Sequence, residues 1–391
     1  MVQPNLIFPL YVIFSSAAVL ATVALITRQS MLVAYIIVGI ILGPWGLKLI
    51  GNADIINGIG DIGIIFLLFL LGLHLPPQKL INVFKQISWV TFGSALIFGS
   101  LGYFLATLFH FTQTECLVIG AAMIFSSTIF GIKLLPTTVL HHQHTGEMVI
   151  GILLLQDIIA IIVLLFMNSA KTTIDSIWFL DIPTVLLELL TILFFSFLFT
   201  RFFLVKLFVY FSRIKEYIFL VAVAWCLGMS LLTQQLGFSM DIGAFIAGVS
   251  LATSPIALYI ADRLRSIRDF CLVLFFFSIG ANFNLDYLPA IIIPAVIFST
   301  VILITKPLVY YVFLRIVKEP PKVSWEVGFR LNQISEFSLI IAYMGLRLKL
   351  LSNQATYLIE AITIITLIVS SYLIIFRYPT PIALSDRLRR D

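Results

Sequence analysis

The stretch "LLLQDIIAII", Leu153 to Ile162, places an amide, Gln156, and a carboxylate, Asp157, inside an otherwise apolar segment. An ionisable group at the centre of a bilayer costs about 2.5–3.5 kcal/mol on insertion scales, and such groups usually mark ion or proton pathways. We therefore expect Asp157 to serve a function within a membrane.

The composition of the whole chain agrees with a membrane setting. Of 391 residues, 61% are hydrophobic and 11% are charged, whereas soluble domains carry about 25% charged residues. The net charge of +5 is explained by basic cytoplasmic loops, so nucleic-acid binding is not expected. Cys116, Cys226 and Cys271 show no C-x-x-C spacing, which argues against a disulfide framework or a thiolate metal site.

Apolar runs separated by Pro, Gly and charged residues predict an all-α polytopic membrane protein. The thirteen predicted helices cover 5–27, 31–50, 54–75, 86–110, 114–134, 145–169, 182–210, 216–235, 238–254, 267–282, 286–315, 323–347 and 353–377. The connections are too short to fold alone, so residues 1–391 are expected to form one transmembrane domain without a soluble regulatory domain.

The Lys and Arg residues predict the orientation of these helices. Of the 24, 18 fall on one side, two lie within spans, and four fall on the other side: Lys48, Lys171, Arg347 and Lys349. The positive-inside rule then places the N-terminus outside and the C-terminus in the cytoplasm.

Two predicted spans contain polar runs that suggest a broken helix. In the fifth span, "FSST" covers Phe125 to Thr128, and in the twelfth, "RLNQISEFSL" covers Arg330 to Leu339. Consecutive hydroxyls in the fifth span can instead bend an intact helix, and an Arg330–Glu336 ion pair can hold the twelfth span in the bundle. Unwound backbone at membrane depth is tolerated where it lines a cavity.

Lys306 lies about twenty residues into the eleventh span and precedes Pro307, which removes a helix hydrogen bond. Spans 4–6 and 11–13 are seven apart, so they cross the membrane in opposite directions. This is the layout of an inverted repeat whose two discontinuous helices surround an ion site near the bilayer midplane. A cation transporter is expected.

The residues resemble a known family. "SSTIFGIKLLPTTVLHHQHTGEMVIGILLLQDIIAI", "YIIVGIILGPWGLKLI", "GDIGIIFLLFLLGL", "LFFFSIGANFNL" and "NQISEFSLIIA" are similar, in order, to signatures of the monovalent cation/proton antiporter-2 family. The Gln-Asp pair resembles its Kef-type potassium/proton branch. The resemblance covers almost the whole chain.

The resemblance implies an NhaA-like fold, with spans 1–3 and 7–10 as dimer, scaffold and linker regions and spans 4–6 and 11–13 as the ion-transport core. It implies a homodimer in a bacterial inner (plasma) membrane. The expected cation- and proton-binding residues are Asp157, Gln156, Ser127 and Thr128, with Asp157 holding the monovalent cation. The expected auxiliary residues are Ser126, Lys306, Asn332, Gln333, Ser335 and Glu336.

The chemistry expected of Asp157 is a competition between two ligands. Burial penalises a charged carboxylate, and either a proton or a monovalent cation neutralises it. We therefore expect antiport by alternating access, with no cofactor beyond the transported potassium or sodium ion and protons. With the neutral Gln156 in place of a second acid, one-for-one electroneutral exchange is the simplest stoichiometry.

Several alternatives remain open. Within the transport class, the runner-up is a sodium/proton antiporter, followed by a sodium-coupled solute symporter. A potassium channel would require a filter such as T-V-G-Y-G, and an enzyme would require a catalytic motif such as H-E-x-x-H; neither string occurs.

Some features depart from the family pattern or leave regulation open. His74 stands where the family often has Glu, and Ser335 stands where it commonly has Gly. The cluster His141, His142 and His144 is either a pH sensor or a group of solvated bystanders. Kef-type proteins often continue into a cytoplasmic nucleotide-binding domain, which is expected here to be separate or missing.

Overall fold

The computed structural model describes residues 7–27, 29, 31–50, 53–73, 77–127, 144–169, 191–211, 214–236, 240–252, 254 and 257–378. Within these residues the protein is helical and contains no strand. The seven described helices that are long and apolar enough to cross a membrane cover Ile7–Ile26, Ile87–Leu108, His144–Leu164, Thr191–Tyr210, Glu216–Gln235, Leu285–Ile316 and Asn353–Arg377. Four shorter apolar helices accompany them, so the predicted all-α membrane fold is confirmed.

The chain divides into two compact units. Unit 1 comprises residues 1–17, 35–80 and 168–282, and unit 2 comprises residues 18–34, 81–167 and 283–391. The first helix, α1 (Ile7–Ile26), contributes residues to both.

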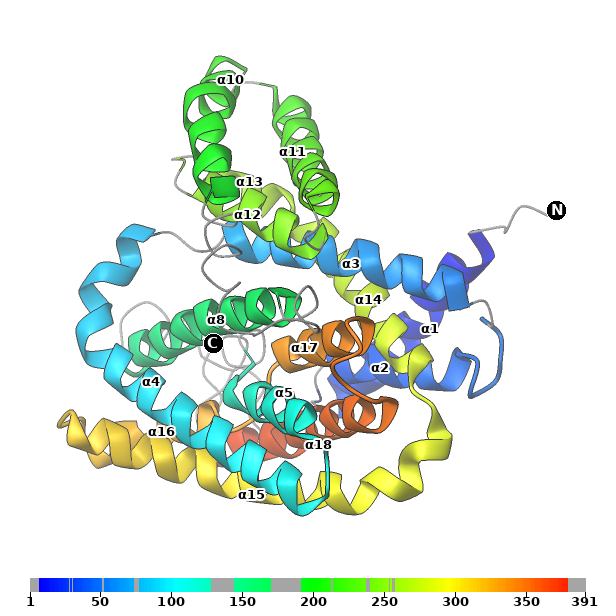
Figure 1. Cartoon of the computed structure of the whole chain (residues 1–391), viewed down its shortest axis with the longest axis vertical. Helices are drawn as coiled ribbons and strands as arrows, with labels where there is room; N and C mark the ends of the chain where they lie inside the picture. The colour runs from blue at the N-terminus through cyan, green and yellow to red at the C-terminus, as the bar shows by residue number, and fades with distance from the viewer. Residues whose placement is uncertain are drawn as a thin grey trace. The chain divides into compact units, whose positions relative to one another are not determined.

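Unit 1 is built around α3 (Ala53–Leu73), which packs against α12 (Met240–Ala252) and α14 (Arg265–Asn282), as Figure 1 shows. The unit also contains most of α2 (Met31–Leu42), the helical segment Thr191–Tyr210 ending in α10 (Val205–Tyr210), α11 (Lys215–Gln235) and α13 (Ala257–Arg263). Helix α2 ends at Leu42, earlier than the predicted residue 50, because Pro44 disfavours helical backbone in the residue before it.

The "GIILG" motif of unit 1 serves close packing between helices. A β-carbon at Gly39 would lie 2.2 Å from the Phe277 carbonyl oxygen of α14, and one at Gly43 would lie 2.7 Å from the α-carbon of Ala281. Any larger side chain would separate the two backbones, so these glycines allow α2 to contact α14 directly.

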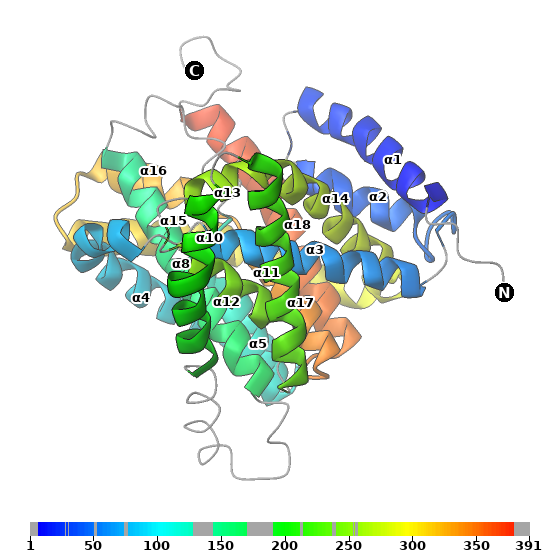
Figure 2. The ribbon, with the colours of Figure 1, turned by 90° about the horizontal axis from the view of Figure 1, so that it is seen from above.

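Unit 2 carries the polar residues singled out above. Its helices are α4 (Pro77–Leu108, from residue 81), α5 (Gln113–Ile124), α8 (His144–Ser169, to residue 167), α15 (Leu288–Ile316), α16 (Pro321–Arg330), α17 (Glu336–Arg347) and α18 (Asn353–Arg377). Helix α15 packs against α16 and α18, and α17 packs against α5 and α18. Helices α5 and α17, far apart in sequence, lie side by side (Figures 1 and 2).

One apolar cluster holds the polar helices of unit 2 in register. It joins Phe98 of α4, Ile152 and Leu153 of α8, and Leu314 of α15 to Val327 of α16, and all five are at most 2% exposed. Close packing of this kind fixes the positions of neighbouring side chains. It therefore positions Gln156, one helical turn beyond Ile152 and Leu153, and Lys306, two turns before Leu314.

Candidate ion-binding site

Two helices of unit 2 are interrupted in the middle of their apolar runs. Helix α5 ends at Ile124, and the next residue, Phe125, has extended backbone with φ −82° and ψ 146°. Helix α16 ends at Arg330, and α17 begins at Glu336 after a non-helical stretch. The break predicted in the twelfth span is therefore present, and the fifth span leaves helical geometry where "FSST" begins.

Lys306 joins these two breaks. Its ammonium Nζ donates hydrogen bonds to the Phe125 carbonyl (2.8 Å), the Ser126 hydroxyl (3.2 Å) and the Gln333 carbonyl (3.2 Å). The side chain is fully buried, and Nζ lies 5.3 Å from the centre of the Phe98 ring. The Phe125 carbonyl lies at the C-terminal end of α5, where backbone carbonyls carry partial negative charge, so the Lys306 ammonium satisfies both its hydrogen-bonding capacity and its charge.

The helix that carries Lys306 agrees with the predicted span 286–315 and runs through the proline. Pro307 lies inside α15, which remains one continuous helix from Leu288 to Ile316. A β-carbon added at Gly328 of α16 would lie 2.9 Å from the Pro307 carbonyl oxygen. Helix α16 therefore packs closely against α15 at Pro307, and α15 does not break there.

Gln156 contacts the end of α5 with both ends of its amide. Its Oε1 accepts from the Ser126 backbone N–H (3.0 Å), while its Nε2 donates to the Ile124 carbonyl (3.2 Å) and the Tyr310 hydroxyl (2.7 Å). The side chain is 1% exposed. Because an amide both donates and accepts, one residue satisfies two backbone groups released where the helix stops.

Ser126 adds a direct link between the breaks, because its hydroxyl donates to the Leu331 carbonyl at 2.8 Å. Ser338 of α17 likewise donates to the Ala122 carbonyl of α5. One hydrogen-bonded cluster therefore joins the two breaks. We call it the crossing cluster, and it consists of Ser126, Gln156, Lys306, Tyr310 and Gln333.

Asp157 follows Gln156 on α8, and its side chain is 3% exposed. Ser127 is fully buried in non-helical backbone, and Glu336 is the first residue of α17, 7% exposed. Thr128 lies outside the described residues, as do His74, His141 and His142. The structure therefore places the predicted carboxylate in the protein interior, one residue from the crossing cluster.

The remaining predicted residues stabilise the second break. Ser335 is the N-cap of α17, where its hydroxyl accepts from the Phe337 N–H at 3.1 Å. Asn332 and Gln333 both accept, through their side-chain oxygens, from the hydroxyl of Ser370 on α18. Arg330 pairs with Glu326 of its own helix at 2.8 Å, rather than with Glu336.

Sequence reasoning missed three members of this region. Tyr310 lies one turn after Lys306, and Thr366 and Ser370 lie on α18, where the Thr366 hydroxyl accepts from the Ile334 N–H at 3.2 Å. Their spacing offered a signal, because residues four apart share one helix face. Single hydroxyls in apolar helices are common, however, and only the fold shows that these contact the breaks.

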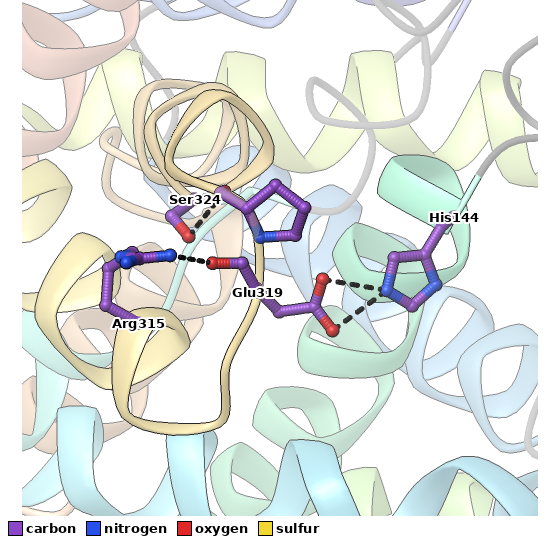
Figure 3. A network of polar contacts seen from close by, with 5 residues as sticks. His144, Arg315, Glu319 and Ser324 are labelled. Carbon is purple, nitrogen blue, oxygen red and sulfur yellow. Dashed lines mark hydrogen bonds and ion pairs between the residues drawn. The ribbon is translucent and has the colours of Figure 1, made fainter.

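His144 forms a separate polar network at the other end of α8, which Figure 3 shows. Its Nε2 lies 2.9 Å from both carboxylate oxygens of Glu319, and the Arg315 guanidinium donates to the Glu319 backbone carbonyl at 2.7 Å. The network ties the first residue of α8 to the turn between α15 and α16. His144 is half exposed yet has a specific partner.

The family model described as "Sodium/hydrogen exchanger, transmembrane" matches residues 13–376, nearly the whole chain. The chain belongs to the sodium/hydrogen exchanger family. It is therefore an integral membrane transporter of the cation/proton antiporter class, and the antiporter resemblance seen in the sequence is confirmed.

Two relatives that are similar to this chain carry different names. The "K(+) efflux antiporter 5" of Arabidopsis thaliana is 30% identical over 391 residues, covering 95% of this chain and 66% of that protein. The "Iron transporter MagA" of Paramagnetospirillum magneticum is 29% identical over 349 residues, covering 88% of this chain and 79% of that protein. The first supports the Kef-type branch of the exchanger family.

A solved structure shows the same fold. The sodium proton antiporter MjNhaP1 from Methanocaldococcus jannaschii superposes with a TM-score of 0.68 at 18% identity, covering 94% of this chain and 95% of that one. At this identity the likeness concerns the fold, and it confirms the antiporter-like architecture of this exchanger.

Proposed function

We propose that this exchanger transports a monovalent cation, potassium in preference to sodium, in exchange for protons, with Asp157 as the shared binding group. The observation that carries the proposal is the buried Asp157 beside the crossing cluster of two interrupted helices. A charged carboxylate is costly in this interior. Binding a proton or a cation removes the cost, and competition for one carboxylate couples the two fluxes.

The remaining ligands of the cation would be oxygens of the chain itself. Ser127 and Thr128, with Gln156, are proposed to complete the site around Asp157. Carboxylate, hydroxyl and carbonyl oxygens are hard ligands of the type that non-transition cations prefer. Potassium is favoured because the Gln156–Asp157 pair is similar to the Kef-type branch and one relative is named a potassium efflux antiporter. Sodium is the alternative, and sodium-coupled solute uptake a more remote one.

The proposal extends to setting and assembly. We propose that the C-terminus lies in the cytoplasm, which the distribution of Lys and Arg supports. A homodimer in a bacterial inner membrane is proposed from the resemblance of the sequence to the antiporter family. Unit 2 is proposed as the ion-transport core and unit 1 as the scaffold. A cytoplasmic nucleotide-binding domain, separate or continuous with a longer chain, is the proposed regulator.

Asp157→Asn tests the central claim, because the substitution keeps the volume and removes the charge. In proteoliposomes that report internal pH, the parent should move protons on addition of potassium, with rubidium, sodium, lithium and ferrous iron as comparison cations. The variant should lose this flux and still purify as a folded protein. Asp286→Asn, which removes an exposed carboxylate of unit 2, is the matched control and should transport normally. Cation-dependent proton flux in Asp157→Asn would refute the shared-carboxylate proposal.

A further inference from the structure

Glu360, two turns into α18, is a buried carboxylate that the proposed function leaves unused. Its side chain is 5% exposed, and among the described residues its Oε2 has no hydrogen-bond partner. A glutamate in a membrane-spanning helix is costly and calls for a reason.

Glu360 belongs to a polar stripe along one face of α18. At about 100° per residue, positions separated by three or four residues share a helix face. The stripe consists of Thr356, Glu360, Thr363, Thr366 and Ser370, and the four hydroxyl residues are at most 1% exposed.

The stripe runs from a cavity at the start of α18 to the second helix break, both within unit 2. At the start of α18 a cavity of about 470 Å³ that is largely open at the protein surface is lined by Tyr287, Lys349, Ser352, Asn353 and Gln354, among others. At its far end Thr366 and Ser370 contact the second helix break. With a rise of about 1.5 Å per residue, Glu360 lies about 10 Å along the axis from Asn353 and about 9 Å from Thr366.

Among the described residues, no ion pair or hydrogen bond joins Glu360 to a charged group. The helices that pack against α18 are α15, α17, α16 and α5. Their titratable groups include Lys306, Tyr310, Glu336, Arg330 and Glu115, and none forms an ion pair or hydrogen bond with Glu360 in the described structure. Tyr357, about one turn earlier on α18, packs against Tyr287 with ring centres 5.4 Å apart and ring planes tilted by 54°. A buried carboxylate with an oxygen that accepts no hydrogen bond, such as Oε2 of Glu360, is stabilised by taking up a proton.

A packing role would account for the hydroxyls alone. Thr356, Thr363 and Thr366 each donate to a backbone carbonyl of or next to their own helix, which satisfies them in an apolar setting. Glu360 is neither small nor satisfied in this way, so packing does not explain it.

We infer that Glu360 is a proton-binding carboxylate that relays protons between the cavity at the start of α18 and the crossing cluster. The carboxylic acid releases its proton to a water molecule on one side, which becomes hydronium, and the carboxylate takes up a proton from hydronium on the other side, which becomes water, so no further reactant is consumed. The inference rests on the proposed proton exchange. In it Glu360 binds and passes on protons, and Asp157 binds the cation.

Infrared difference spectroscopy on the full chain in lipid tests the protonated state directly. The parent should show the carbonyl stretching band of a protonated carboxylic acid that disappears in Glu360→Gln and persists in Asp157→Asn. Glu360→Asp should retain the band at a shifted frequency, which covers the case in which the glutamine variant folds poorly. Spectra of both Glu360 variants that match the parent would overturn the inference.

Transport against pH tests the relay. Glu360→Gln should slow exchange most at alkaline pH, where protons are scarce, so that the alkaline limb of the rate profile moves to lower pH. Glu360→Asp should restore part of that limb. The matched control is Glu115→Gln, a buried carboxylate that already accepts from the Thr112 and Ser352 N–H groups, and its profile should keep the parent shape. An unchanged pH profile in Glu360→Gln would rule out the relay. Failure of the Asp157 proposal is a separate result, because exchange would then survive in Asp157→Asn.

Discussion

Replacing Lys306 by methionine tests whether the ammonium holds the two helix breaks together. The substitution keeps a long unbranched side chain and removes the charge and all three N–H donors. The carbonyls of Phe125 and Gln333 would lose these hydrogen bonds in a fully buried place. Helices α5 and α16–α17 would then remain joined chiefly by the Ser126 and Ser338 hydroxyls.

The size of the effect follows from two opposing terms. Three hydrogen bonds to a charged donor, at about 1.5–3 kcal/mol each, amount to about 5–9 kcal/mol when they are lost. Removing a buried ion also removes its desolvation penalty, which is several kcal/mol. We expect a net loss of about 2 kcal/mol in the free energy of unfolding, which corresponds to a fall in Tm of about 4–8 °C for a domain of 150–250 residues.

The assay is thermal unfolding of purified protein in detergent, with Lys322→Met as the control. Lys322 is an exposed lysine on α16, so Lys322→Met removes the same ammonium group from a solvent-exposed position. This control should change Tm by about 1 °C or less, as surface substitutions usually do. A Lys306→Met protein with an unchanged or higher Tm would show that desolvation outweighs the hydrogen bonds. The ammonium would then be retained for transport and not for the stability of the crossing.

Two further substitutions address the neighbouring networks. Tyr310→Phe removes an acceptor of the Gln156 amide and should cost about 1 kcal/mol, the usual worth of a neutral hydrogen bond, measured as a fall in Tm; an unchanged Tm would mean that Gln156 is held by α5 alone. His144→Gln removes the exposed pair with Glu319 and should cost at most about 1 kcal/mol. The Tm of parent and His144→Gln measures this cost, and a fall that corresponds to several kcal/mol would contradict the small contribution expected of the contact.

The fold and the helix breaks were predictable because their signals are local. A run of about 20 apolar residues has few structures open to it other than a membrane helix. Consecutive polar residues such as Ser126–Ser127 and Asn332–Gln333 conflict with an apolar helix, and the structure resolves the conflict by leaving the helix there. Gln156 and Lys306 stood out for the same reason.

The partners of these residues were not predictable, because they are set by packing between helices distant in sequence. Tyr310, Thr366 and Ser370 look like ordinary members of apolar helices until the fold brings them to the breaks. Glu360 was visible as a charge within a predicted span. Its sequence neighbours are apolar, and only the burial of the whole stripe and the cavity at its end connect it to the crossing cluster.

The contacts also assign different tasks to the two strongest polar side chains of the crossing cluster. Gln156 bonds the end of α5 and Tyr310, so it fixes the first break to α8 and α15. Lys306 donates to Phe125 in the first break and to Gln333 in the second. These two residues are 208 positions apart in the chain. A displacement of one break relative to the other would therefore cost the Lys306 hydrogen bonds and leave those of Gln156 intact. Since no such cost arises when both breaks move together, we expect the crossing of unit 2 to move as one body during exchange.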